Sequence, residues 1–81
     1  MNQDHMSSRF ASLAASLPPL VPATELPGHL NNLYSPKYLA NLRWSGKGPR
    51  CIKVGRKVAY LREDVITWLE AEAREFTPDA E

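Results

Sequence analysis

The residues of this 81-residue sequence that are best suited to chemistry are cationic, and most of them lie in one stretch. Residues 37–62 contain no aspartate or glutamate and eight basic residues: Lys37, Arg43, Lys47, Arg50, Lys53, Arg56, Lys57 and Arg62. Residues 1–36 carry a formal charge of −1 and residues 63–81 one of −6, so the net charge of +1 conceals this segregation. We expect the basic stretch to form a polyanion-binding face, in preference to a chance clustering of solvated charges.

Groups that catalyse reactions or bind metals are sparse. His5, His29 and Cys51 are the only histidines and cysteine, so a zinc site of the usual Cys/His kind and an internal disulfide are both excluded. Glu63 and Asp64 imitate a catalytic carboxylate pair, but the electrostatics of a helix start explain them better. The sequence therefore predicts a non-enzymatic protein with no catalytic residue, no metal site and no cofactor.

The composition is that of one small globular domain, with 43% apolar and 23% charged residues. The sequence contains no run of ~18 apolar residues that would predict a membrane-spanning helix. It also lacks the apolar stretch of a secretory signal near its start. We expect an intracellular protein in a reducing compartment, without a membrane partner.

The first part of the chain is expected to be weakly ordered. Residues 1–20 are rich in serine and small residues, and Pro18-Pro19 would stop a helix, so we predict a flexible N-terminal arm. Its apolar residues have helical spacing, which leaves open a short helix formed on a partner. A short helix is predicted at about 23–31, with Pro27 in its first turn and Asn31-Asn32 at its end.

The helix predicted at about 36–45 has the clearest boundaries. Ser35 is a natural N-cap, Pro36 a natural first helical residue, and Gly46 a natural C-terminal stop. The helical period places Leu39 and Leu42 on the buried side. It places four residues on the outward side: Lys37, Ala40, Asn41 and Trp44.

A β-hairpin and a last helix are expected next. Ile52, Val54, Val58 and Tyr60 alternate with other residues, and a three-residue loop, 55–57, keeps all four on one face. A two-residue loop would place Lys57 on the apolar face and is therefore disfavoured. The last helix is predicted at about 63–75, with one side formed by Val65, Leu69, Ala73 and Phe76, and with Trp68 beside them. Residues 77–81 are expected to be a polar tail.

This order of elements, a helix, a tight turn, a helix, a basic hairpin and a helix, is typical of a winged helix-turn-helix. Residues 35–49 resemble the recognition helix and following loop of the phage-type excisionase and AlpA-like regulator family, and residues 52–60 resemble its wing. Asp64-Val65 and Trp68-Leu69 resemble its closing helix. The resemblance covers roughly residues 21–71. It implies a MerR-like winged helix, mainly α with a small β-hairpin, of three helices and a two-stranded wing, spanning about 21–76.

The resemblance also implies roles for individual side chains. Lys37 suits guanine acceptors or a phosphate and Asn41 suits adenine in the major groove, with an ordinary solvated helix face as the alternative. Ala40 either meets a thymine methyl or is simply a good helix former. The expected contacts with the DNA backbone are Tyr38, Arg43, Lys47, Arg50 and Lys53, and the expected wing tip is Arg56 with Lys57. For Tyr38 the edge of the core is an equal alternative, and for Arg43 an acidic partner is one. We expect Trp44 to pack against the wing or the Gly48-Pro49 loop, with a sugar–phosphate contact as the second interpretation.

The resulting prediction is a sequence-specific protein for double-stranded DNA in the bacterial cytoplasm, near the nucleoid. The favoured role is that of an excisionase, or recombination directionality factor, which bends DNA at an attachment site and directs an integrase of the tyrosine recombinase type towards excision of a mobile element. A small transcriptional regulator acting at a promoter is the alternative, and a protein–protein adaptor or antitoxin-like partner is the second. The charge segregation also predicts head-to-tail self-association on tandem sites.

Overall fold

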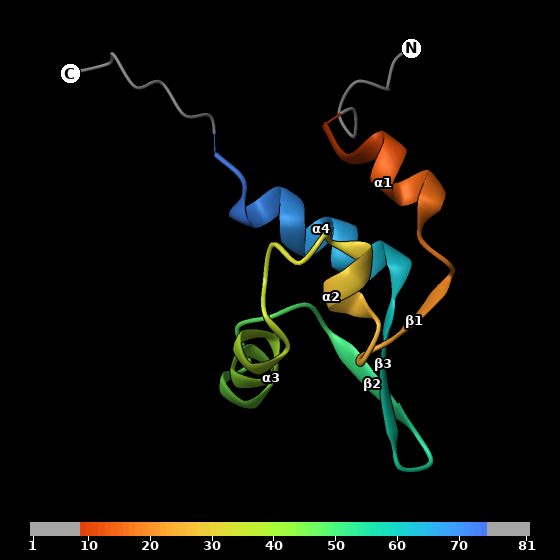
Figure 1. Cartoon of the computed structure of the whole chain (residues 1–81), viewed down its shortest axis with the longest axis vertical. Coiled ribbons are helices and arrows are strands. Elements are labelled where there is room, and N and C mark those ends of the chain that lie inside the picture. Colours follow the sequence, from red (N-terminus) through yellow and green to blue (C-terminus); the bar gives the residue numbers. More distant parts are fainter. Residues whose placement is uncertain (1–8, 75–81) are drawn as a thin grey trace, which may run out of the picture.

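The computed structural model describes residues 9–74, which form helices around a small antiparallel sheet (Figure 1). The elements are α1 (Ala11–Ser16), β1 (Leu20–Pro22), α2 (Leu26–His29), α3 (Pro36–Ser45), β2 (Cys51–Val54), β3 (Lys57–Leu61) and α4 (Arg62–Glu72). The sheet order is β1-β3-β2, so β3 is the central strand. The core residues lie between the sheet and the helices: Leu17, Val21, Leu26, Leu30, Leu39, Tyr60, Val65 and Leu69.

Helix α3 has the boundaries that its sequence predicts. The Ser35 side chain accepts a hydrogen bond of 3.0 Å from the backbone N–H of Tyr38, and Pro36 occupies the first helical position. Gly46 adopts a left-handed conformation, with φ of 73°, and its N–H bonds to the last turn of the helix. Leu39 is buried and Leu42 packs against the core, as the helical period predicts.

Helix α2 is shorter than the predicted segment 23–31, because regular helix covers only four residues. Pro27 lies in its first turn, as expected. Asn31 and Asn32 then adopt φ values of 56° and 61°, in the left-handed region that asparagine tolerates better than most residues. This pair ends the helix and turns the chain into α3.

The hairpin loop contains two residues, Gly55 and Arg56, so the prediction of a three-residue loop is wrong. Val54 pairs with Lys57 and Ile52 with Ala59 in the antiparallel ladder. Gly55 has a φ of 65° and Arg56 does not share this positive value, a pattern that suits the tight turns with glycine in first place. The register places Ile52 and Val54 on the outer face of the sheet, where both are exposed. Turn geometry thus prevailed over the burial of two apolar side chains.

The sheet has a third strand that the sequence analysis did not predict. β1 pairs with β3, with Val21 opposite Tyr60, and both side chains are completely buried. The β2–β3 hairpin is therefore part of a three-stranded sheet. Strand β1 is only three residues long and contains Pro22, so neither its length nor its composition signals a strand.

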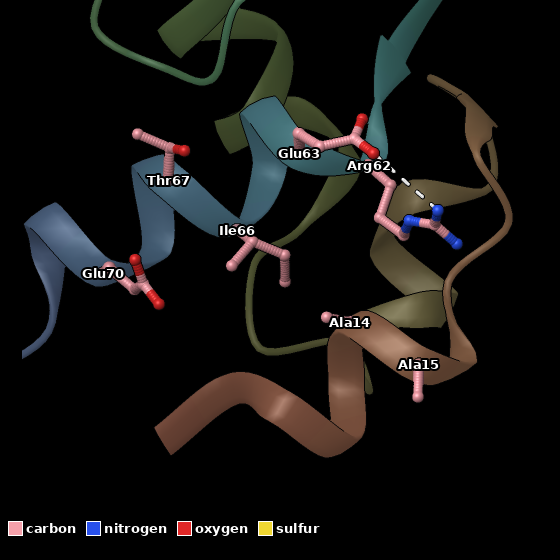
Figure 2. Close-up of a pocket in the computed structure, with 7 residues that line it drawn as sticks. All are labelled: Ala14, Ala15, Arg62, Glu63, Ile66, Thr67 and Glu70. Atoms are coloured by element: carbon pink, nitrogen blue, oxygen red, sulfur yellow. Dashed lines mark ion pairs between the residues drawn. The ribbon is translucent and has the colours of Figure 1, made fainter. Parts of the chain in front are cut away.

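Residues 9–20 are not the weakly ordered arm that was predicted, because they fold onto the rest of the chain. Leu17 is only 2% exposed, and Phe10 and Leu13 pack against the core. Helix α1 lies alongside α4 (Figure 2). The Arg62 guanidinium donates to the Leu17 carbonyl over 3.2 Å, and the Arg62 backbone N–H donates to the Pro19 carbonyl over 3.0 Å. Residues 1–8 of the predicted arm lie outside the described residues.

Helix α4 begins one residue before the predicted segment and has Glu63 and Asp64 in its first turn, but it ends at Glu72, because the backbone of Ala73 is extended. Val65 and Leu69 are buried, and Trp68 packs against the core, as predicted. Phe76 and the tail 77–81 lie outside the described residues. In the described part of the chain, 9–74, no helix is both long and apolar enough to cross a membrane.

Candidate nucleic-acid interface

Helix α3 and the tip of the β2–β3 hairpin lie at the same end of the molecule (Figure 1). Helices α1 and α4 lie at the other end. The α3 helix, the hairpin and the loop between them supply seven of the eight basic residues in the acid-free stretch. The fold therefore converts a run of charges in the sequence into a cationic end of the molecule, which we refer to as the basic end.

The outward side of α3 carries Lys37, Asn41 and Trp44, all exposed. These residues have i, i+4 and i+7 spacing, which aligns them along one stripe of a helix. Ala40, placed on the same side by the helical period, is only half exposed. The prediction that Trp44 packs against the wing or the following loop is wrong, because its side chain is 88% exposed.

Arg43 connects the α3 helix to the sheet. Its Nη1 atom donates a hydrogen bond of 2.9 Å to the hydroxyl of Tyr60, which lies on the central strand. Arg43 is half-buried, and its side chain bonds to this phenol rather than to the acidic side chain considered above. The contact holds the guanidinium at the angle between α3 and the hairpin.

Surface hollows lie around Arg43 at this angle. One, of about 360 Å³, is lined by Arg43, Trp44, Cys51, Lys53 and Val58. Another, of about 320 Å³, continues along the loop to Gly46 and Arg50. Arg50 and Lys53 are exposed, so two of the predicted backbone contacts border a concave surface beside α3. Concave cationic surfaces concentrate field lines and attract anions.

A third hollow, of about 550 Å³, is lined by both wing-tip residues, Arg56 and Lys57, together with Arg43. Glu25, in the turn before α2, lines it as well. This carboxylate is the one acidic side chain among the residues that line the hollows around Arg43. Glu25 lies outside the acid-free stretch of the sequence, and the chain order does not reveal its neighbours in space.

Lys47 is exposed in the loop after α3, and its backbone is fixed from the other side of the molecule. The indole Nε1 of Trp68, on α4, donates to the Lys47 carbonyl over 2.9 Å. The Trp68 ring contacts that of Tyr34 at 5.3 Å, and Tyr34 stacks on Tyr38 of α3 with ring centroids 5.5 Å apart. Tyr38 is therefore part of an aromatic cluster, and its half-exposed ring also lies at the surface.

The aromatic cluster has one perturbed group. Burial raises the pKa of the Tyr34 phenol above its ordinary value of 10.0, and the nearby Glu72 and Tyr38 raise this pKa further. Each cause disfavours the phenolate, so Tyr34 keeps its proton at neutral pH. The sequence analysis did not single out Tyr34, which lies in the turn before α3.

A separate groove lies between α1 and α4, away from the basic end (Figure 2). It has a volume of about 570 Å³ and is lined by Ala14, Ala15, Arg62, Glu63, Ile66, Thr67 and Glu70. Arg62 and Glu63 form an ion pair of 3.7 Å at its end. Arg62 is the eighth basic residue of the acid-free stretch, and it lies at this groove instead of at the basic end. Its guanidinium contacts the Leu17 carbonyl and the Glu63 carboxylate.

Comparison with models of known protein families found no match to this chain, and a search of curated protein sequences found none either. Among residues 9–74, no three His, Cys, Asp or Glu side chains lie close enough together to hold a metal ion. The description of the site therefore rests on its own geometry. It consists of the exposed stripe of α3, the cationic surface around Arg43 between α3 and the hairpin, and the hairpin tip.

Proposed function

We propose that this chain is a sequence-specific DNA-binding protein with a winged helix-turn-helix domain. In this proposal α3 enters the major groove, and the β2–β3 hairpin follows the adjacent backbone or minor groove. The observation that carries the proposal is the position of the exposed α3 stripe and of the hairpin tip at one end of the molecule. Both come from a stretch with eight basic residues and no acid.

Phosphate contacts would supply most of the affinity, and base-edge contacts the specificity. Arg50, Lys53, Arg56 and Lys57, in the loop and hairpin that follow α3, are exposed and free to meet phosphates. Arg43 is held by Tyr60 through one nitrogen, which leaves other guanidinium donors for a phosphate. Lys37 and Asn41 carry the donors and acceptors that suit guanine and adenine edges.

The biological role that we favour is that of an excisionase acting with an integrase. The support is the resemblance of residues 35–49 and 52–60 to the recognition helix and wing of that family. Several copies side by side would hold a DNA bend that costs of order 1–6 kcal/mol. Such a bend would favour an integrase complex competent for excision over one competent for integration.

The first experiment measures affinity for a duplex containing the flanking attachment site as a function of salt. If about five phosphates are contacted, log affinity falls against log salt with a slope of roughly −4 to −5. The double variant Arg56→Ala/Lys57→Ala makes the slope shallower by about two units and weakens all sequences alike. Arg74→Ala, at an exposed basic residue beyond α4, is the control and leaves the slope unchanged.

The second experiment tests base reading. Lys37→Ala and Asn41→Ala each weaken specific binding by ~1–3 kcal/mol and relax the preference at one base position. Both side chains are exposed, so the melting temperature should stay close to that of the parent. If both variants bind the specific site as the parent does, α3 is not the recognition helix.

The third experiment separates the two roles. In a recombination assay with the cognate integrase and both pairs of attachment sites, added protein stimulates excision and leaves integration unchanged or inhibited. If excision is equally efficient without the protein while a nearby promoter responds to it, the role is that of a transcriptional regulator. If no duplex is bound, the adaptor role replaces both.

A further inference from the structure

Trp44 has the highest exposed fraction of the large apolar side chains in the described residues, 88%. A tryptophan ring buries 150–250 Å² when it packs, so a ring left in water forgoes a large hydrophobic gain. Trp44 lies in the last turn of α3, whereas the aromatic cluster beside this helix consists of Tyr34, Tyr38 and Trp68. Its position therefore suits contact with a binding partner.

The surroundings of Trp44 indicate what kind of partner. The ring borders the hollow of about 360 Å³, and the two charged residues that line this hollow are Arg43 and Lys53. No acidic side chain lines this hollow. An apolar ring that lines the same hollow as two cations fits a partner that presents an apolar group close to negative charges. Duplex DNA has this chemistry in its major groove, where the thymine 5-methyl group lies between the phosphate backbones.

The helical spacing gives Trp44 a place in the order of contacts. Trp44 lies seven positions after Lys37 and three positions after Asn41. These differences correspond to about 10.5 Å and about 4.5 Å along a helix axis. Base steps along one strand are about 3.4 Å apart. If α3 lies along the groove, Trp44 falls about three base steps from the base contacted by Lys37 and between one and two steps from that contacted by Asn41.

We propose that Trp44 is a specificity-determining residue that contacts the 5-methyl group of a thymine, one or two base steps beyond the adenine read by Asn41. The inference rests on the proposed function, because it requires α3 in the major groove. It adds an apolar reader to the two polar ones, Lys37 and Asn41. Arg43 and Lys53 hold the phosphates on either side of the methyl group that the ring covers.

The test replaces each thymine of the specific site by deoxyuridine, which removes only the 5-methyl group. At one thymine this replacement weakens binding by the parent about four-fold, the equivalent of one buried methyl group. Trp44→Ala binds the thymine and the uracil duplexes equally at that position. Trp44→Phe, which keeps an apolar ring, restores part of the discrimination. The exposure of Trp44 predicts that both variants fold as the parent does, which thermal melting checks.

A matched control is Leu33→Ala, which removes another large and exposed apolar side chain outside α3. This variant keeps the four-fold discrimination of the parent. A second measurement is acrylamide quenching of tryptophan fluorescence. DNA protects the exposed Trp44 from the quencher, and this protection disappears in Trp44→Phe, in which only the half-buried Trp68 remains.

The outcomes separate the two proposals. If no duplex is bound with a salt-dependent affinity, the proposed function itself fails. If specific binding is present but no thymine shows discrimination, or if Trp44→Ala discriminates as the parent does, only the role of Trp44 is overturned. Unchanged DNA binding by Trp44→Ala, together with loss of binding to the integrase, would assign the ring to a protein partner.

Discussion

Tyr34 contacts two helices through its ring, since it stacks on Tyr38 of α3 and meets Trp68 of α4. Its phenol is less acidic than that of a free tyrosine because of burial and because Glu72 and Tyr38 lie nearby. The neutral phenol thus contributes stability that is fully present below the pKa of the unfolded chain, near 10. This contribution is lost as the pH rises through the higher pKa of the folded state.

Tyr34→Phe therefore makes the alkaline side of the stability profile shallower. We expect the melting temperature of the parent to fall more steeply above pH ~10 than that of the variant, because unfolding of the parent releases the proton of the Tyr34 phenol. Thermal melts from pH 8 to 11 check this, and both proteins contain the same lysines, whose titration cancels in the comparison. Parallel profiles would contradict the pKa shift.

Glu25 places a negative charge at the hollow that Arg43, Arg56 and Lys57 line. Across a distance of ~10 Å in water, one charge changes the interaction with a phosphate by about 0.4 kcal/mol, or about two-fold in affinity. We expect Glu25→Gln to tighten binding to all duplexes by this factor at low salt, and the gain to vanish at high salt. Glu70→Gln, which changes the same charge on α4, is the control and leaves single-site affinity unaltered.

At the scale of elements, α1 and β1 make the N-terminal segment part of the core. Leu17→Ala should destabilise the protein by ~2–4 kcal/mol, since it removes a buried side chain and leaves a cavity. Leu20→Ala is the matched control, because that leucine is 44% exposed and its loss costs far less. Urea unfolding measures both. Equal effects would mean that residues 9–20 do not pack as described.

The elements that the sequence predicts well are those with local signals. α3 has an N-cap at Ser35 and a left-handed stop at Gly46, and local hydrogen bonds fix both. β1 depends on pairings between distant residues, such as Leu20 with Leu61, which no local pattern encodes. The hairpin register is local, because the two-residue turn between Val54 and Lys57 sets it. The alternation of Ile52 and Val54 led to the wrong register, because the prediction assumed that every apolar strand residue faces the core.

The candidate site was predictable in the same unequal way. The helical period places Lys37 and Asn41 correctly on the exposed side of α3. The period also places Trp44 on the exposed side. The prediction that its ring packs against the hairpin or the loop came only from the expectation that a large ring must be covered, and the ring is exposed. The contacts of Arg43 with Tyr60 and of Trp68 with Lys47 join residues 17 and 21 positions apart, beyond the reach of any periodicity.

At the scale of the whole molecule, the charges are divided between two ends. The basic end contains α3 and the hairpin tip, whereas exposed Glu63, Glu70 and Glu72 lie on α4 at the other end. A contact between the acidic end of one copy and the basic end of the next is heterologous, and it propagates along DNA instead of closing into a dimer.

Binding to two sites in direct repeat should therefore be cooperative, with a coupling on the order of ten-fold at low salt. Glu70→Gln should lower this coupling while the affinity for a single site stays the same. Gel-shift titration of one-site and two-site duplexes measures both quantities. A stable dimer bound to an inverted repeat would refute the head-to-tail arrangement.

The long-range contacts of β3 and α4 also set the order in which the molecule is completed during synthesis. A chain is made from its N-terminus, and β1 has no strand partner until Lys57 to Leu61 leave the ribosome. The loop after α3 is not anchored until Trp68 emerges. A nascent chain in which the basic residues have been made therefore still lacks the contacts of β3 and Trp68 that position them. The surface proposed to meet DNA is therefore complete only after Trp68 has left the ribosome.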